Sequence, residues 1–307
     1  MNLPYSSIGD FYKTRFGGIR AQKIPVTIAT DCPNRMGLKN METCIFCDQW
    51  GSSAYPEQRF QALHQQIELK LKSMGEKYPT SIFLAYFQAY TNTFLGIKKL
   101  RESFDCALSF PQVKGIIIGT RPDCLSPALF DLWNEYNAKS FVAIELGVQS
   151  FFDDQLEFLK RGHTGEDSIK AIRKIKEKTQ VDLGIHLMFG LPGETDLQII
   201  ETAKRVSDLP VDNVKLHNLH VLKNTPLEKK YRDGEFSPID LEDYSRKVIL
   251  FLQHLRADVK IQRLAALSSR WDELVAPDWT RHKLRSAQFI ISRMKAEGAR
   301  QGQYCTF

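Results

Sequence analysis

Short apolar runs that alternate with helix-like stretches constrain the fold of this chain more than any other feature. We expect strands at 25–30, 81–87, 114–119, 141–146, 181–189 and 211–221. A continuous run such as KGIIIG at 114–119 is typical of a strand that is buried on both faces of a parallel sheet. Helical sequence separates these runs, and the alternation predicts a parallel sheet with right-handed crossovers.

The number of strands limits the closure of this sheet. Six strand–helix units are too few for the closed eight-fold barrel. The sequence therefore predicts an α/β fold, a partial (three-quarter) (β/α)6 TIM-like barrel, with a flat doubly wound sheet as the alternative. We expect an N-terminal arm at 1–23, a core barrel at 24–226 and a mostly helical extension at 227–307. Within the extension we expect helices at 240–257 and 281–297 and a short strand at 258–264.

The charge of the chain is uneven. The net charge is +6, and residues 241–307 contain 12 Lys or Arg against 7 Asp or Glu. A basic C-terminal section is compatible with a nucleic-acid partner and equally with an ordinary solvated surface. We find no apolar run of membrane-spanning length and no N-terminal signal sequence, so we expect a cytoplasmic protein without a membrane partner.

Three of the six cysteines lie directly after the first expected strand. Eleven residues separate Cys32 from Cys44, and two separate Cys44 from Cys47. Three thiolates from one loop suit an iron–sulfur cluster with one open iron, because such clusters usually have four cysteine ligands. The alternatives are half of a zinc site, a redox pair or three buried cysteines. A zinc site lacks a nearby fourth ligand, since the nearest histidine is His64. We expect the other cysteines to be structural or incidental: Cys106, Cys124 and Cys305.

The cysteine loop also resembles a known family. The sequence CPNRMG at 32–37, and the Cys-x-aromatic-Cys end formed by Cys44, Phe46 and Cys47, resemble the radical S-adenosylmethionine (SAM) superfamily. The resemblance is to the YhcC/YtqA group, related to the radical SAM domain of the Elongator catalytic subunit. It implies a 4Fe-4S cluster held by Cys32, Cys44 and Cys47, and reductive cleavage of SAM to methionine and a 5′-deoxyadenosyl radical. The segment LKNMET before Cys44 departs from the family's glycine-rich sequence.

Six residues are candidate cofactor contacts: Phe46, Gln88, Glu145, Gln149, Arg161 and His186. The resemblance implies that Phe46 lies near the adenine. Residues 88–93 depart from the family's Gly-Gly-Glu run, so contact with the SAM amino group is expected from their backbone carbonyls or from Gln88. Arg161 is expected at the SAM carboxylate, to which a guanidinium can donate two parallel hydrogen bonds. Glu145 can accept hydrogen bonds from a ribose or an amino group, or form a salt bridge inside the barrel. Gln149 follows in the same motif, and His186 either faces the ligand or is a core histidine.

Several other polar residues near the strand ends are expected to have structural roles rather than to bind the cofactors. His163 is expected to serve local turn structure. His217 and His220 are expected on opposite faces of the sixth strand, because their separation is odd, and so not in one metal site. The sequence GLPGET at 190–195 predicts a turn in which Glu194 or Thr195 caps the next helix.

Together these features favour a radical SAM enzyme with a 4Fe-4S cluster and SAM as cofactors. By resemblance to the Elongator group, the substrate is expected to be a nucleoside of tRNA or another RNA, and the electron donor a flavodoxin or ferredoxin. A radical SAM enzyme acting on a small metabolite or a protein is one alternative. A non-enzymatic zinc-binding or RNA-binding module is the other.

Overall fold

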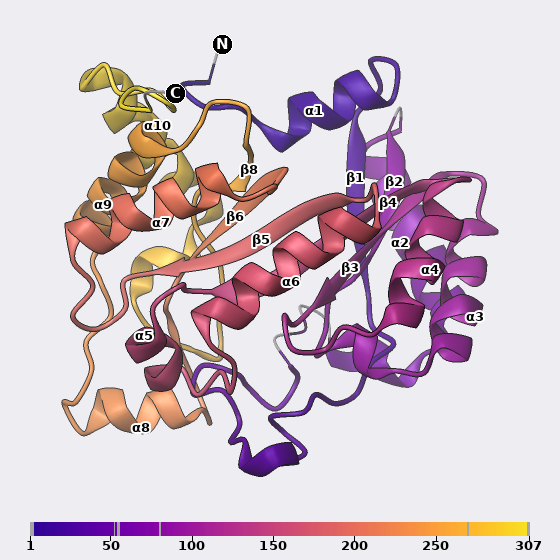
Figure 1. Ribbon diagram of the computed structural model, residues 1–307, viewed down its shortest axis with the longest axis horizontal. Helices are drawn as coiled ribbons and strands as arrows, with labels where there is room; N and C mark the ends of the chain where they lie inside the picture. The colour runs from indigo at the N-terminus through magenta and orange to yellow at the C-terminus, as the bar shows by residue number, and fades with distance from the viewer. Residues whose placement is uncertain (1–2, 52, 54–55, 80, 269, 306–307) are drawn as a thin grey trace.

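The computed structural model describes residues 3–51, 53, 56–79, 81–268 and 270–305. A seven-stranded parallel sheet forms its centre, in the order β1-β2-β3-β4-β5-β6-β8 (Figure 1). The strands are β1 (Ala21–Val26), β2 (Ile82–Phe87), β3 (Val113–Thr120), β4 (Phe141–Gln149), β5 (Asp182–Phe189), β6 (Asn213–Asn218) and β8 (Lys260–Arg263). The sheet forms an open partial barrel, so the predicted fold class is confirmed.

Helices join successive strands and cover the outer face of the sheet (Figure 1). They are α2 (Leu63–Lys77), α3 (Ile97–Leu108), α4 (Pro127–Asn137), α5 (Asp153–Phe158), α6 (Gly165–Lys178), α7 (Asp196–Asp208) and α9 (Leu241–His254). Capping boxes start α6 at Thr164 and α7 at Thr195, the second being one of the two caps expected from the sequence. No helix in the described part of the chain is long and apolar enough to cross a membrane.

The sheet contains one more strand than the six expected as barrel strands. β8 comes from the C-terminal section and pairs in parallel with β6, Val214 opposite Ile261. We expected a short strand at 258–264, but as part of the extension. A strand of four residues carries too little sequence pattern to show which sheet it joins.

Two strand boundaries also differ from expectation. β1 begins at Ala21, before the expected 25, and contains Pro25. Proline is tolerated there because β1 is an edge strand of the sheet. β6 ends at Asn218, and the chain then turns into β7 (Val221–Leu222), which pairs antiparallel with β9 (Leu274–Ala276). The segment expected as one long strand is therefore two short ones.

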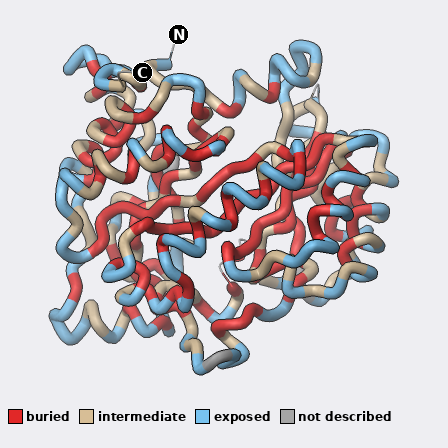
Figure 2. The backbone as a smooth tube through the Cα atoms, in the orientation of Figure 1, coloured by how far each residue is buried: buried red, intermediate tan, exposed pale blue. Residues whose placement is uncertain are grey.

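The two faces of the sheet pack differently. On the outer face, Ile116 and Ile118 of β3 belong to the main core together with Phe104 of α3 and Trp133 of α4. Figure 2 shows the strands buried along most of their length. On the inner face, Ile117 belongs to a separate apolar cluster. This alternation is the period of two that a strand imposes on its side chains.

The N-terminal arm closes one end of the barrel. α1 (Ile8–Arg15) starts at Ser7, whose side chain accepts hydrogen bonds from the next turn. Ile8 and Tyr12 of α1 pack in the inner apolar cluster, where Phe141 is the first residue of β4. The amino ends of the strands are therefore partly filled with apolar side chains, beside the hydrogen-bonded pair Asp182 and Asn213 at the starts of β5 and β6. Ligands bind at the opposite, carboxyl ends in parallel βα folds.

Trp133 offers a test of the outer core. Its side chain is fully buried, and its indole nitrogen has no hydrogen-bond partner among the described residues. We expect Trp133→Ala to lower the free energy of unfolding by about 3–5 kcal/mol, measured by urea denaturation. Trp133→Phe should cost clearly less, because it keeps a ring in the core. Equal losses for the two variants would contradict this packing.

Candidate active site

The cysteine loop lies at the carboxyl ends of the strands and is fixed there by backbone hydrogen bonds. The Ile45 amide donates to the Leu159 carbonyl at 3.2 Å, and the Leu227 amide at the start of α8 (Pro226–Arg232) donates to the Ile45 carbonyl at 3.0 Å. Ile45 also packs in an apolar cluster with Leu159 and Leu227. The loop is thus held by the chain that follows α5 and by the C-terminal section.

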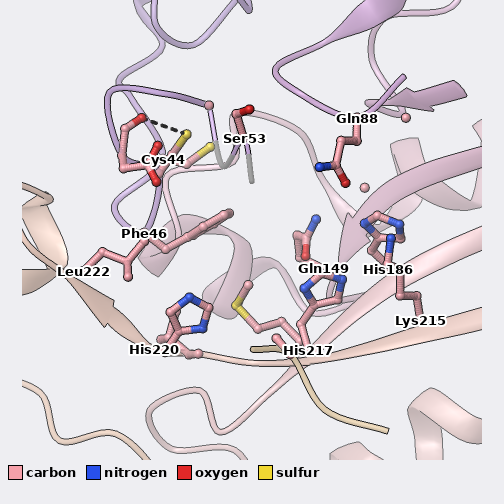
Figure 3. Close-up of a pocket in the computed structure, with 18 of the residues that line it drawn as sticks. Cys44, Phe46, Ser53, Gln88, Gln149, His186, Lys215, His217, His220 and Leu222 are labelled. Atoms are coloured by element: carbon pink, nitrogen blue, oxygen red, sulfur yellow. Dashed lines mark hydrogen bonds between the residues drawn. The ribbon is translucent and has the colours of Figure 1, made fainter. Parts of the chain in front are cut away.

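All nine residues expected to bind the cluster or SAM line one cavity of about 530 Å³. They are Cys32, Cys44, Cys47, Phe46, Gln88, Glu145, Gln149, Arg161 and His186. In Figure 3, Cys44 and Phe46 lie on one side of this cavity and His186 on the other, with Gln149 between them. The fold therefore brings together residues that are distant in sequence.

Arg161 is buried against the cysteine loop rather than exposed at a helix end. One terminal nitrogen of its guanidinium lies 3.4 Å from the Cys44 sulfur, and the other donates to the Gly147 carbonyl at 2.7 Å. Its Nε atom is buried and has no partner in the described structure. The side chain is therefore positioned to bind an acceptor at the cavity wall.

The cysteine sulfurs lie in an environment suited to metal-bound thiolates. Asn34 places its amide nitrogen 3.6 Å from the Cys44 sulfur, so two donors point at that atom. Burial and the neighbouring Cys44 raise the pKa of the Cys47 thiol to about 11, although Arg35 opposes this shift. A metal would have to displace that proton, since the thiolate is the ligand.

The donor set fits a cluster better than a single ion. Among the residues that the structure describes, no three His, Cys, Asp or Glu side chains are placed to hold one metal ion. In a 4Fe-4S cluster each thiolate binds a different iron, so the ligands need not converge on one point. Three thiols that line one cavity, with hydrogen-bond donors to a sulfur, match such a cluster.

The carboxyl end of β4 has an unusual backbone. Gln149 adopts a left-handed conformation, with φ of 69°, and the pairing of β4 with β5 is irregular between Leu146 and Gln149. A Cβ atom added at Gly147 would lie 3.1 Å from the Gln149 amide nitrogen and 3.3 Å from Arg161. The left-handed backbone conformation strains a non-glycine residue such as Gln149, and such strain concentrates at binding sites.

Glu145 forms a salt-bridge network inside the barrel, one of its two expected roles. Its carboxylate accepts from Lys23 at 2.5 Å, Tyr86 at 2.6 Å and Lys215 at 2.8 Å, and lies 2.7 Å from Nε2 of His186. Burial acts against ionisation, but the Lys215 and Lys23 cations hold the pKa of Glu145 well below its usual value. Glu145 is therefore ionised and fully occupied by protein groups.

This network contains residues that sequence reasoning missed. Lys215 and His217 alternate with Val214 and Leu216 on β6, a pattern that would have marked them as facing the interior. Arg263 also lines the cavity, but its strand was not expected to join the barrel. Alternation along β6 could therefore have identified Lys215, whereas no local sequence pattern identified Arg263.

The expectation that His217 and His220 lie on opposite faces of the sixth strand is wrong. Both side chains line the cavity. The strand ends at Asn218, so the alternation of faces does not extend to His220. Burial lowers the pKa of His220 to about 4, and burial together with the neighbouring Arg263 lowers the pKa of His217 well below its usual value. Both imidazoles are therefore neutral at pH 7.

The C-terminal section completes the mouth of the cavity. Arg270 donates to the Ser53 carbonyl and pairs with Asp48, both in the cysteine loop, and with Glu273 at 2.7 Å. Trp271 lines the same cavity and is 62% exposed. The N-terminal arm, by contrast, contributes no side chain to the described cavity lining.

His163 provides a pH test of this region. It is buried, and burial together with the Arg161 and Arg121 cations lowers its pKa from 6.5 to about 4. Between these values the folded state binds fewer protons than the unfolded state. Stability is therefore complete above pH 6.5 and falls as the pH drops toward 4, by up to about 3 kcal/mol. Urea denaturation at pH 7.5 and 4.5 should show this loss, and His163→Leu should reduce it. An unchanged loss in the variant would contradict the assignment.

The chain belongs to the radical SAM superfamily. The model of that superfamily matches residues 26–206, and the model of the Radical_SAM C-terminal domain matches residues 211–296. The resemblance expected from the cysteine loop is confirmed.

Relatives extend over nearly the whole chain. Protein MJ0486 of Methanocaldococcus jannaschii is 36% identical over 302 residues, covering 97% of this chain and 91% of the relative. YtqA of Bacillus subtilis is 31% identical over 308 residues, covering 98% and 95%. A shorter match, 32% over 143 residues, is to the tRNA uridine(34) acetyltransferase of M. jannaschii; it covers 44% of this chain and 26% of that protein.

A solved structure shows the same fold. The Elp3 protein of Methanocaldococcus infernus superposes with a TM-score of 0.67 at 20% sequence identity. The match covers 92% of this chain and 64% of the solved chain. The partial barrel and the C-terminal section that follows it are therefore shared.

Proposed function

We propose that this protein is an enzyme that binds a 4Fe-4S cluster and SAM in the cavity and modifies a nucleoside of RNA, most simply of tRNA. The observation that carries the proposal is the convergence of Cys32, Cys44 and Cys47 on one cavity, with Arg161 directed at the Cys44 sulfur. Cys32, Cys44 and Cys47 would hold the cluster. When bound, the cluster supplies the electron that cleaves SAM reductively to a 5′-deoxyadenosyl radical.

The residues around the cysteines supply binding and orientation. Arg161 is hydrogen-bonded to the Gly147 carbonyl, which fixes its guanidinium at the wall where the carboxylate of SAM would lie. Phe46 offers an aromatic face on the cysteine side of the cavity, as Figure 3 shows, for the adenine. Gln88 and Gln149 add amide donors and acceptors. A small number of precisely placed polar groups in an otherwise largely apolar lining is the usual form of a small-molecule site.

Two observations support RNA as the substrate. One relative acts on tRNA according to its name, although the match covers 26% of that protein. The mouth of the cavity also carries Trp271, which is 62% exposed. An exposed indole can stack on an unpaired base.

The first test is anaerobic reconstitution of the full chain with iron and sulfide. We expect about four irons per chain and 5′-deoxyadenosine from SAM under strong reductant. The donor that reduces the cluster in the cell would be a flavodoxin or ferredoxin. Tight zinc binding without SAM cleavage would contradict the proposal and favour a zinc-binding or RNA-binding module.

The substrate class is tested separately by incubating the active protein with unmodified tRNA and analysing the nucleosides by mass spectrometry. We expect one nucleoside to change mass when SAM and reductant are both present. SAM cleavage with no change in any nucleoside would direct the search to small metabolites and proteins.

A further inference from the structure

The wall of the cavity opposite the cysteine loop, together with the barrel interior directly behind it, carries an excess of positive charge. Lys23 of β1, Lys215 of β6 and Arg263 of β8 lie around one fully buried carboxylate, Glu145. The other nearby acid, Asp182, is partly neutralised, because burial and Asp212 raise its pKa to about 7. The groups that face this wall therefore carry more cations than anions.

Arg263 is the least compensated of these cations. Its Nε donates to the Leu216 carbonyl at 3.2 Å, and one terminal nitrogen donates to the His217 ring at 2.6 Å. Among the described residues, no carboxylate lies within ion-pair distance of Arg263. A partly buried cation paired only with neutral acceptors is costly for a folded protein. Such a group in a cavity is a candidate for binding a ligand of opposite charge.

The neighbouring side chains add to this wall without neutralising it. The His186 and His217 rings contact each other, with centroids 4.9 Å apart. Burial lowers the pKa of His186 to about 4 and that of Lys215 to about 7. The Lys23 and Arg263 cations contribute to the shift at Lys215. An anion bound in the cavity would offset the electrostatic repulsion of Lys215 by Lys23 and Arg263.

The wall lies deeper in the barrel than the cysteine loop, and two of the expected SAM contacts, Glu145 and His186, border it. Lys215 lies three residues before the end of β6, whereas the cysteine loop follows the end of β1. At about 3.3 Å per residue, Lys215 is roughly 10 Å deeper in the barrel than the strand ends. Figure 3 shows the same separation, with Cys44 and Phe46 on one side and Lys215 on the other.

We propose that Lys215, His217 and Arg263 form an anion subsite that binds a carboxylate or phosphate group of the substrate. All three line the cavity. This inference rests on the proposed function, since it assumes that a substrate enters the same cavity as SAM. An anion held at this depth would direct the rest of the substrate toward the cysteine loop, where the radical is generated.

The test measures binding of two small anions, acetate and inorganic phosphate, to the reconstituted protein by calorimetry at constant ionic strength. We expect saturable binding of at least one, and the tighter of the two identifies the group. Arg263→Gln should weaken that binding about tenfold or more, as loss of a charge-assisted hydrogen bond implies. Arg246→Gln, which breaks an exposed pair with Asp196, should leave it unchanged.

Thermal unfolding separates binding from folding. Because Arg263 adds uncompensated charge, we expect Arg263→Gln to keep or raise the unfolding temperature of the anion-free protein. Equal anion affinity in wild type and Arg263→Gln, or no saturable binding of either anion, would overturn the inference. Anion binding is measured without SAM cleavage, so the two proposals can fail separately. Anion binding without SAM cleavage would contradict only the proposed function. SAM cleavage without anion binding would contradict only this inference.

Discussion

A protein with Cys47→Ala should retain its fold, lose most of its iron and form no 5′-deoxyadenosine from SAM. A cluster held by three cysteines has no spare protein ligand, so removal of one thiolate leaves a second iron open. Cys47 is only partly buried and lies in a loop, so its truncation should cost little stability. Iron content, the absorbance of the reconstituted cluster and product analysis measure the effect.

The other cysteines provide matched controls. Cys106→Ala and Cys305→Ala remove thiols outside the cavity lining and should leave iron and SAM cleavage unchanged. Cys124→Ala is the sharper control, because Cys32 contributes to raising the pKa of Cys124 and therefore lies near it. If Cys124→Ala lost iron as completely as Cys47→Ala, the assignment of three ligands would be wrong.

The cysteine loop and the alternation of strands and helices could be predicted from the sequence because both depend on local pattern. Cys32, Cys44 and Cys47 are separated by fixed spacings, and their loop follows a recognisable strand. Arg161 was found from its position in a family motif. Its burial and its contact with the Cys44 sulfur depend on how two distant loops pack, which no local pattern records.

The interior charge network shows where sequence reasoning stops. Glu145 was expected either to bind a ligand or to form a salt bridge, and its four partners come from four strands. Lys215 could have been found from alternation on β6. Arg263 could not, because its place beside β6 depends on a four-residue strand that sequence pattern did not assign to the barrel.

Glu145 should be the most sensitive residue for stability in the barrel interior. We expect Glu145→Gln to lower the free energy of unfolding by about 3 kcal/mol or more at pH 7, since it leaves the partly buried Lys23 and Lys215 without their shared anion. Urea denaturation followed by circular dichroism measures the loss. Glu135→Gln, which breaks exposed pairs with Arg101 and Lys139, is the matched control and should leave the free energy of unfolding nearly unchanged, because exposed ion pairs add little stability.

A double variant and a pH series distinguish loss of charge balance from loss of packing. In Glu145→Gln/Lys215→Met one cation leaves with the anion, so part of the lost stability should return. Burial lowers the pKa of Lys215 to about 7 from 10.5. The folded state therefore binds fewer protons than the unfolded state between these values, and Lys215 disfavours folding less as the pH rises through 7 toward 10.5. The deficit of Glu145→Gln should accordingly be larger at pH 6 than at pH 9. A deficit that is the same at both pH values and is not relieved by Lys215→Met would mean that Glu145 acts through shape and hydrogen bonds rather than through its charge.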